Sequence, residues 1–199
     1  MIDALFGSKT RVKLLHLFLN NPGKSFYVRE ITRLIDEQIN SVRRELANML
    51  SIGIITSDNA DNKLYYEVNQ RYEHYVALRA IFGDEHSTKA SKAVAKDTDD
   101  WKPIVQQLHG LRLAISAGVL VRGSTSKIDL LLVGTFSPVK VKTAIKAVER
   151  LEGRELNYSA ISYDEFYYRL SVRDKFITEI LNSNHVVVVD TDDVLKGQK

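Results

Sequence analysis

The chain has 199 residues, enough for one large or two small domains, and an ordinary apolar fraction of 44%. It contains no cysteine, which excludes disulfide bonds, thiolate zinc sites and cysteine nucleophiles and fits a reducing cytoplasm. The formal net charge is only +3, so the chain is not a general binder of polyanions, and any cations that meet a partner must be concentrated locally.

The first third of the chain shows a regular alternation of apolar and turn residues. Ser8 is a plausible N-cap for the first helix, and Gly53 ends the third. We expect Ile31, Leu34 and Ile35 to face the core, together with the stripe of Ile39, Val42, Leu46, Met49 and Leu50. In order, the expected elements are a helix at 8–20, a strand at 26–28, a helix at 29–35, a turn at 36–38, a helix at 39–51, and a hairpin pairing 54–56 with 64–68 across 57–63.

This order of elements is that of a winged helix-turn-helix, whose second helix lies in the DNA major groove. With the apolar stripe inward, four polar residues occupy the exposed first turns of the 39–51 helix: Asn40, Ser41, Arg43 and Arg44. Arginine bonds guanine and asparagine bonds adenine through paired hydrogen bonds, although either arginine could instead contact phosphate. The alternative is that the two arginines are solvated and pair with Glu45 or Glu37.

The expected wing offers little positive charge, because its tip (58–63) carries two acids and one base. We therefore expect it to contribute little to DNA binding. Contacts with the phosphate backbone are expected instead from cations outside the reading helix, aided by the N-termini of the first two helices. The candidates are Lys9, Arg11, Lys24, Arg29 and Lys63.

Residues 8–82 resemble winged-helix transcription regulators of bacteria and archaea, most specifically in INSVRRELANMLSIGII followed by KLYYEVN. The resemblance implies double-stranded DNA as partner, and a homodimer would double the phosphate contacts. Another helix is expected at 71–83, either packing within its own domain or forming a dimer or inter-domain contact. The polar segment 84–100 reads as a linker, which gives domains at 1–83 and 101–199.

Beyond residue 100, helices alternate with strands, which predicts a small α/β domain with a mixed sheet and an α+β chain overall. The continuous apolar run at 128–133 is typical of a buried strand. The expected elements are helices at 101–111, 138–151 and 163–182 (one long or two shorter), and strands at 113–120, 128–133, 156–161 and 186–189, with a turn at 122–126.

The stretch LRLAISAGVLVRGSTSKIDLLLVG (111–134) resembles the start of a minimal nucleotidyltransferase of the DNA polymerase beta-like superfamily, and 162–190 resembles that family's tail. The family has a Gly-Ser turn, an Arg-Gly segment and an Asp-x-Asp pair that binds two metals. Gly118, Arg122, Gly123 and Asp129 match the pattern. Val119 replaces the serine, and Lys127 replaces the first aspartate.

The third carboxylate is also missing, because Asn157 or Tyr158 stands on the later strand. We therefore expect a catalytically inactive domain without metal or cofactor, used for dimerisation, partner binding or ligand sensing. Lys127 and Arg122 beside the Gly118 turn could hold a phosphate or nucleotide effector, but Lys127 more simply pairs with Asp129 or with solvent. An unrelated small α/β domain is the alternative.

The sequence thus predicts a cytoplasmic, DNA-binding transcriptional regulator with no enzymatic activity. No window of about 18 apolar residues suggests a membrane span, and no signal peptide is visible. Two other functions are compatible with the sequence. One is an active nucleotidyltransferase, of antitoxin type, that modifies a protein partner. The other is a protein–protein adaptor whose winged helix does not touch DNA.

Overall fold

The computed structural model describes residues 6–60, 62–83 and 100–195. The chain divides into two compact units, Met1–Lys96 and Asp97–Lys199. This division falls within the expected linker, of which residues 84–99 lie outside the described part of the chain. The fold is α+β with two sheets, the second of them mixed, which confirms the expected class. No helix in the described ranges is long and apolar enough to cross a membrane.

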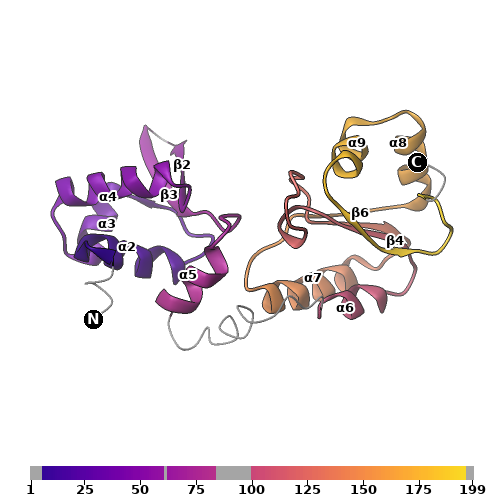
Figure 1. The fold of residues 1–199 in the computed structure, drawn as a ribbon, viewed down its shortest axis with the longest axis horizontal. Coiled ribbons are helices and arrows are strands. Elements are labelled where there is room, and N and C mark those ends of the chain that lie inside the picture. The colour runs from indigo at the N-terminus through magenta and orange to yellow at the C-terminus, as the bar shows by residue number, and fades with distance from the viewer. Residues whose placement is uncertain (1–5, 61, 84–99, 196–199) are drawn as a thin grey trace. The chain divides into compact units, whose positions relative to one another are not determined.

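The first unit combines helices with a three-stranded antiparallel sheet of order β1-β3-β2, of which Figure 1 labels β2 and β3. Ser8 caps its first described helix, since its hydroxyl accepts a hydrogen bond from the Arg11 amide. Leu14 and Phe18 from that helix meet Val42 and Leu46 in one buried cluster. The elements are α2 (Lys9–Leu19), β1 (Phe26–Tyr27), α3 (Val28–Ile35), α4 (Ile39–Ser51), β2 (Ile55–Ala60), β3 (Lys63–Val68) and α5 (Tyr75–Phe82).

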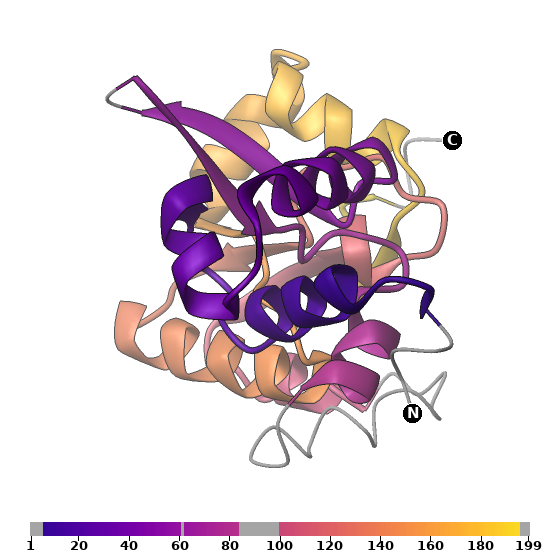
Figure 2. The same cartoon turned by 90° about the vertical axis from the view of Figure 1, so that its left-hand side faces the viewer.

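The hairpin is longer than the sequence predicted, because pairing continues from Ile55–Val68 to Ala60–Lys63. Asn62 adopts a left-handed conformation (φ +57°), which asparagine tolerates and which permits a tight connection between the strands. The expected loop at 57–63 is therefore mostly strand. Figure 2 shows the hairpin projecting beyond the helices of its unit.

Three details of the first unit differ from expectation. Leu34 and Ile39, expected to face the core, are 56% and 37% exposed. The αL conformation of Asp36 (φ +50°) ends α3 and redirects the chain, so residues on either side of the turn lie on its outer surface. The last helix begins at Tyr75 rather than near residue 71, after a series of turns.

The second unit is a three-layer arrangement in which helices cover both faces of a four-stranded sheet of order β6-β5-β4-β7 (Figure 1). Strands β5 and β6 are parallel, and the other pairs are antiparallel. The elements are α6 (Lys102–Gln106), β4 (Leu111–Ser116), the 3₁₀ helix η3 (Gly118–Leu120), β5 (Leu130–Gly134), α7 (Pro138–Glu152), β6 (Tyr158–Ile161), α8 (Tyr163–Ser171), α9 (Lys175–Asn182) and β7 (Val186–Asp190).

Alternation along the strands divides the interior of this unit into two cores. Leu130 and Leu132 face one cluster with Trp101 from the α6 end and Ile145 of α7. Leu131 and Val133 face the other cluster, with Phe166 of α8 and Ile177 and Ile180 of α9. The continuous apolar run of β5 is thus explained by burial on both faces, as the sequence predicted.

Several boundaries in the second unit were predicted wrongly. Strand β4 ends at Ser116 instead of residue 120, because Gly118 turns left-handed (φ +51°) and opens η3. Helix α6 covers only Lys102–Gln106 instead of 101–111. By contrast, the expected alternative of two shorter helices at 163–182 is confirmed. They are separated by Arg173 at φ +52° and by Asp174, whose carboxylate caps α9 at the Phe176 amide.

Candidate nucleic-acid interface

The first turns of α4 present polar side chains to solvent. Asn40, Arg43 and Arg44 are exposed, as predicted, whereas Ser41, which was also expected to be exposed, is half-buried. Their orientation is set by Val42 and Leu46, which are completely buried on the opposite side of the helix. Within the described ranges, no hydrogen bond or ion pair engages these four side chains. Their donors and acceptors are therefore available to a partner.

The two acids that were possible partners for these arginines are tied instead to α2. Glu37 pairs with Lys13 at 2.8 Å, and the same ammonium donates to the Ile35 carbonyl at 2.7 Å. This contact fastens the turn between α3 and α4. The hydrogen bond from Lys13 lowers the pKa of Glu37, so the carboxylate is held ionised by α2.

Glu45 is buried in the middle of α4 and pairs with Arg11, whose Nε lies 3.0 Å from the carboxylate. Burial alone would raise the pKa of Glu45, but hydrogen bonds from Ser8 and Arg11 outweigh it, and the pKa is lowered. Arg11 also donates to the Phe6 carbonyl at 3.2 Å. Arg11, predicted as a phosphate contact, therefore has a structural use in joining α2 to α4.

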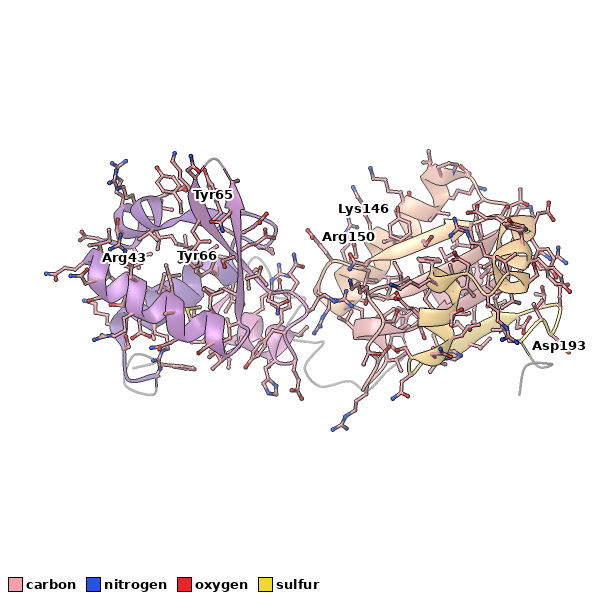
Figure 3. All side chains as sticks on the ribbon, turned by 90° about the horizontal axis from the view of Figure 1, so that it is seen from above. Arg43, Tyr65, Tyr66, Lys146, Arg150 and Asp193 are labelled. Carbon is pink, nitrogen blue, oxygen red and sulfur yellow. The ribbon has the colours of Figure 1, made fainter. Side chains whose placement is uncertain are left out.

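The four α4 residues do not share one direction. Asn40 and Arg44 are one turn apart, and the helical repeat puts them almost opposite the buried side. Arg43 lies on the flank toward the sheet, where its charge acts on the Tyr66 hydroxyl of β3; Figure 3 labels both. Burial raises the pKa of Tyr66, and Arg43 partly opposes that rise. Asn40 and Arg44 thus form the crest of α4.

The predicted backbone contacts occupy varied surroundings. Lys9 and Arg29 are exposed near the N-termini of α2 and α3. Lys24 lies over the Phe26 ring at 4.8 Å from its centre. The ammonium of Lys63, at the start of β3, lies 5.2 Å from the centre of the Tyr27 ring, so it is directed toward β1.

The solvent face of the hairpin is a shallow groove with an acidic lining. It encloses a volume of about 270 Å³ and contains the carboxylates of Asp58 and Glu67 beside Tyr65. Asp58 also accepts a hydrogen bond from the Asn59 amide at 2.8 Å. These carboxylates agree with the expectation that the wing repels phosphate, although Asp61 lies outside the described residues.

The residues on which the nucleotidyltransferase resemblance rests lie between β4 and β5 in the second unit, and several polar groups there are hydrogen-bonded within the unit. Asp129, the residue that matches a metal-binding aspartate, is completely buried. One of its carboxylate oxygens accepts from the Val119 amide and the other from the Asn157 amide, each at 2.8 Å. Asp129 therefore acts as a clamp between the loop and β6.

Backbone amides around the Gly118 turn are also hydrogen-bonded within the unit. The Gly118 amide donates to the Ser124 hydroxyl at 2.8 Å. The hydroxyl of Ser183, contributed by the end of α9, accepts from the amides of Thr125 and Ser126 at 2.9 and 3.1 Å. Arg122, Gly123 and Lys127 are exposed at the surface of this loop, and Lys127 meets solvent, one of the two outcomes expected for it.

Three structural residues were not found from sequence. Lys13 was assigned no role, and Glu45 was considered only as a partner of the arginines on its own helix. The apolar pattern gave no sign that each binds a distant partner. Ser183 follows α9 in sequence, nearly 60 residues from the loop that it closes, without a motif to connect them. No cluster of three or more metal-ligating side chains occurs in the part of the chain that the structure describes.

Comparison of the chain with protein-family models, with curated proteins and with solved structures gives no match.

Proposed function

We propose that the chain is a DNA-binding transcriptional regulator whose first unit is a winged helix-turn-helix. The order α2–β1–α3–α4–β2–β3 and the sheet order β1-β3-β2 support this assignment. In this proposal α4 enters the major groove, the hairpin is the wing, and two copies of the chain bind a two-part site as a homodimer.

The observation that carries the proposal is that the acids in and just before α4 are paired with cations of α2, whereas the arginines of α4 are not paired within the described ranges. Glu37 and Glu45 are held by Lys13 and Arg11, whereas Arg43 and Arg44 have no acidic partner among the described residues. A merely solvated helix has no need for this separation. A helix that meets phosphate and base edges benefits from it, because its cations remain unneutralised.

In the second unit we propose a non-catalytic domain that serves in dimerisation, partner binding or ligand sensing. Asp129 is buried, and both of its carboxylate oxygens accept hydrogen bonds from backbone amides. This arrangement opposes metal binding, since two-metal catalysis requires several free anionic oxygens in one place. The internally bonded amides of the loop also oppose a phosphate cradle.

A protein–protein adaptor is the second candidate, and the acidic groove of the hairpin favours it. Asp58 and Glu67 would repel a DNA backbone but would accept a basic segment of another protein. This function predicts no salt-dependent affinity for DNA.

The test is binding of the full chain to fluorescent duplexes, one from its own promoter region and one scrambled, at two salt concentrations. We expect preferential and salt-sensitive binding. Arg43→Ala with Arg44→Ala should abolish the preference and leave thermal unfolding unchanged, because both side chains are exposed.

A matched control removes two positive charges outside the proposed reader, through Arg71→Ala with Lys175→Ala. It should keep the preference. Unchanged DNA affinity in the Arg43/Arg44 variant would exclude the proposed reading helix, and the absence of binding to either duplex would favour the adaptor.

A further inference from the structure

Helix α7 in the second unit carries a line of positive charge. Lys142, Lys146 and Arg150 follow one another at intervals of four residues, so they form one row along about 12 Å of helix. All three are exposed, while Val141, Ala144, Ile145 and Val148 bury the opposite side of the helix. Figure 3 labels Lys146 and Arg150, whose side chains extend outward from α7. We call Lys142, Lys146 and Arg150 the cationic row.

The cationic row is not neutralised within its unit. No ion pair joins its members to any residue in the described ranges. Glu149, the acid beside it on α7, uses a carboxylate oxygen to accept from the Leu156 amide at 3.0 Å. The Glu149 carboxylate therefore holds the loop that follows α7, and in the described part of the chain it forms no ion pair with the cationic row.

The opposite layer of the same unit is arranged differently. There Arg169 pairs with Glu165 at 2.8 Å, and Lys175 pairs with Glu179 at 3.6 Å, each one helical turn apart. In the same domain, Arg169 of α8 and Lys175 of α9 are paired with acids, whereas no described acid pairs with the cationic row of α7. Like charges one turn apart weaken a helix, so the row is unfavourable to α7 unless an external anion neutralises it.

We propose that the cationic row binds the phosphate backbone of duplex DNA as a second, sequence-independent contact of the chain. A linear array of cations suits a linear array of phosphates, and such contacts raise affinity without reading bases. A lipid surface fits less well, because Val141, Ile145 and Val148 of α7 are buried in the core. The exposed Val139 and Leu151 lie far apart on the helix and form no continuous apolar face. The inference rests on the proposed function for the choice of DNA.

The experiment measures the affinity of the full chain for its own promoter duplex and for a scrambled duplex across a range of salt. The test variant is Lys142→Ala with Lys146→Ala and Arg150→Ala, since alanine preserves the helix. The control is Lys142→Arg with Lys146→Arg and Arg150→Lys, which keeps every charge. Circular dichroism and thermal unfolding verify that both variants fold.

If each cation contacts one phosphate, the slope of log affinity against log salt should become shallower by about 2.7 in the alanine variant. The ratio of affinities for the two duplexes should stay the same, and the charge-keeping control should bind like the parent chain. An unchanged slope, or an equal effect in the control, would overturn the inference. Binding to anionic phosphatidylserine vesicles is measured in parallel. The inference would also be overturned if the alanine variant bound both duplexes like the parent chain and lost only its binding to these vesicles.

The failure of this inference and that of the proposed reader are distinguishable. The Arg43/Arg44 variant should lose its preference for the promoter duplex. The alanine variant of the cationic row should instead lose salt-sensitive affinity for both duplexes. If the Arg43/Arg44 variant binds like the parent and the alanine variant does not, DNA binding resides in the second unit and the reading helix is rejected.

Discussion

The crest of α4 and the loop around Asp129 are both rich in polar residues, but they use them in opposite ways. On α4, Asn40 and Arg44 have no bonded partner in the described ranges, and nearby Glu45 is held by Arg11. In the loop, the Asp129 carboxylate is buried and both oxygens accept backbone amides. Polar groups without partners in their own chain can bind another molecule, and α4 offers such groups, whereas the bonded groups of the loop have a structural use.

This contrast predicts that Asp129 contributes stability rather than activity. Asp129→Ala leaves the Val119 and Asn157 amides without acceptors, and unsatisfied donors cost about 1–3 kcal/mol each, so we expect a loss of about 3 kcal/mol. Denaturant unfolding measures the loss. Asp129→Asn, which keeps one acceptor oxygen, should lose less. Equal stability of the parent and the alanine variant would mean that the clamp is unimportant.

A similar test separates structure from DNA contact at Arg11. Arg11→Ala leaves the buried Glu45 carboxylate without its guanidinium, and losing a hydrogen bond to a charged group costs about 2 kcal/mol. We expect a lower denaturation midpoint but the same salt slope for DNA. A shallower slope with unchanged stability would restore Arg11 as a phosphate contact. Lys9→Ala is the comparison: Lys9 is exposed on the same helix and was also predicted to contact phosphate, so this variant should keep its stability and have a shallower salt slope.

The sequence predicted the elements of the first unit well because its periodicities are strong and local. Helix α4 was located residue for residue at 39–51, since Val42, Leu46 and Met49 repeat along one side. Leu34 was wrongly placed inside, because apolar character alone does not distinguish a core position from an exposed one beside a turn. Local rules also do not register the left-handed Asp36 that produces this turn.

The site was less predictable than the fold, because its chemistry depends on partners distant in sequence. The exposure of Arg43 and Arg44 followed from the helical repeat. The pairing of Glu45 with Arg11, which is 34 residues away, did not follow from any local pattern. Arg11 was consequently expected at the phosphate backbone. In the second unit, Gly118 and Asp129 were expected within strands at 113–120 and 128–133, but both lie in the connection between β4 and β5, where burial changes the use of the Asp129 carboxylate.

The crest of α4 also permits a distinction between its two arginines. Arg44 shares the crest with Asn40, whereas Arg43 is on the flank near Tyr66, so we expect Arg44 to read a base and Arg43 to contact phosphate. Lysine preserves charge but not paired hydrogen bonds, so Arg44→Lys should reduce the preference for the promoter duplex about 10-fold, or about 1.4 kcal/mol. Arg43→Lys should leave that ratio unchanged. The opposite result would exchange their roles.

The smallest expected effect distinguishes binding from stability on α7. Lys146→Glu changes two repulsive pairs, with Lys142 and Arg150, into attractive ones, and each pair of this spacing contributes about 0.2–0.5 kcal/mol. Each change removes a repulsion and adds an attraction of this size, so the variant should be more stable by about 1 kcal/mol, yet bind both duplexes more weakly. Lys146→Gln, which only removes the charge, should lie between it and the parent. A row maintained for stability would lose stability on substitution, so the sign of the change in unfolding free energy decides between the two functions.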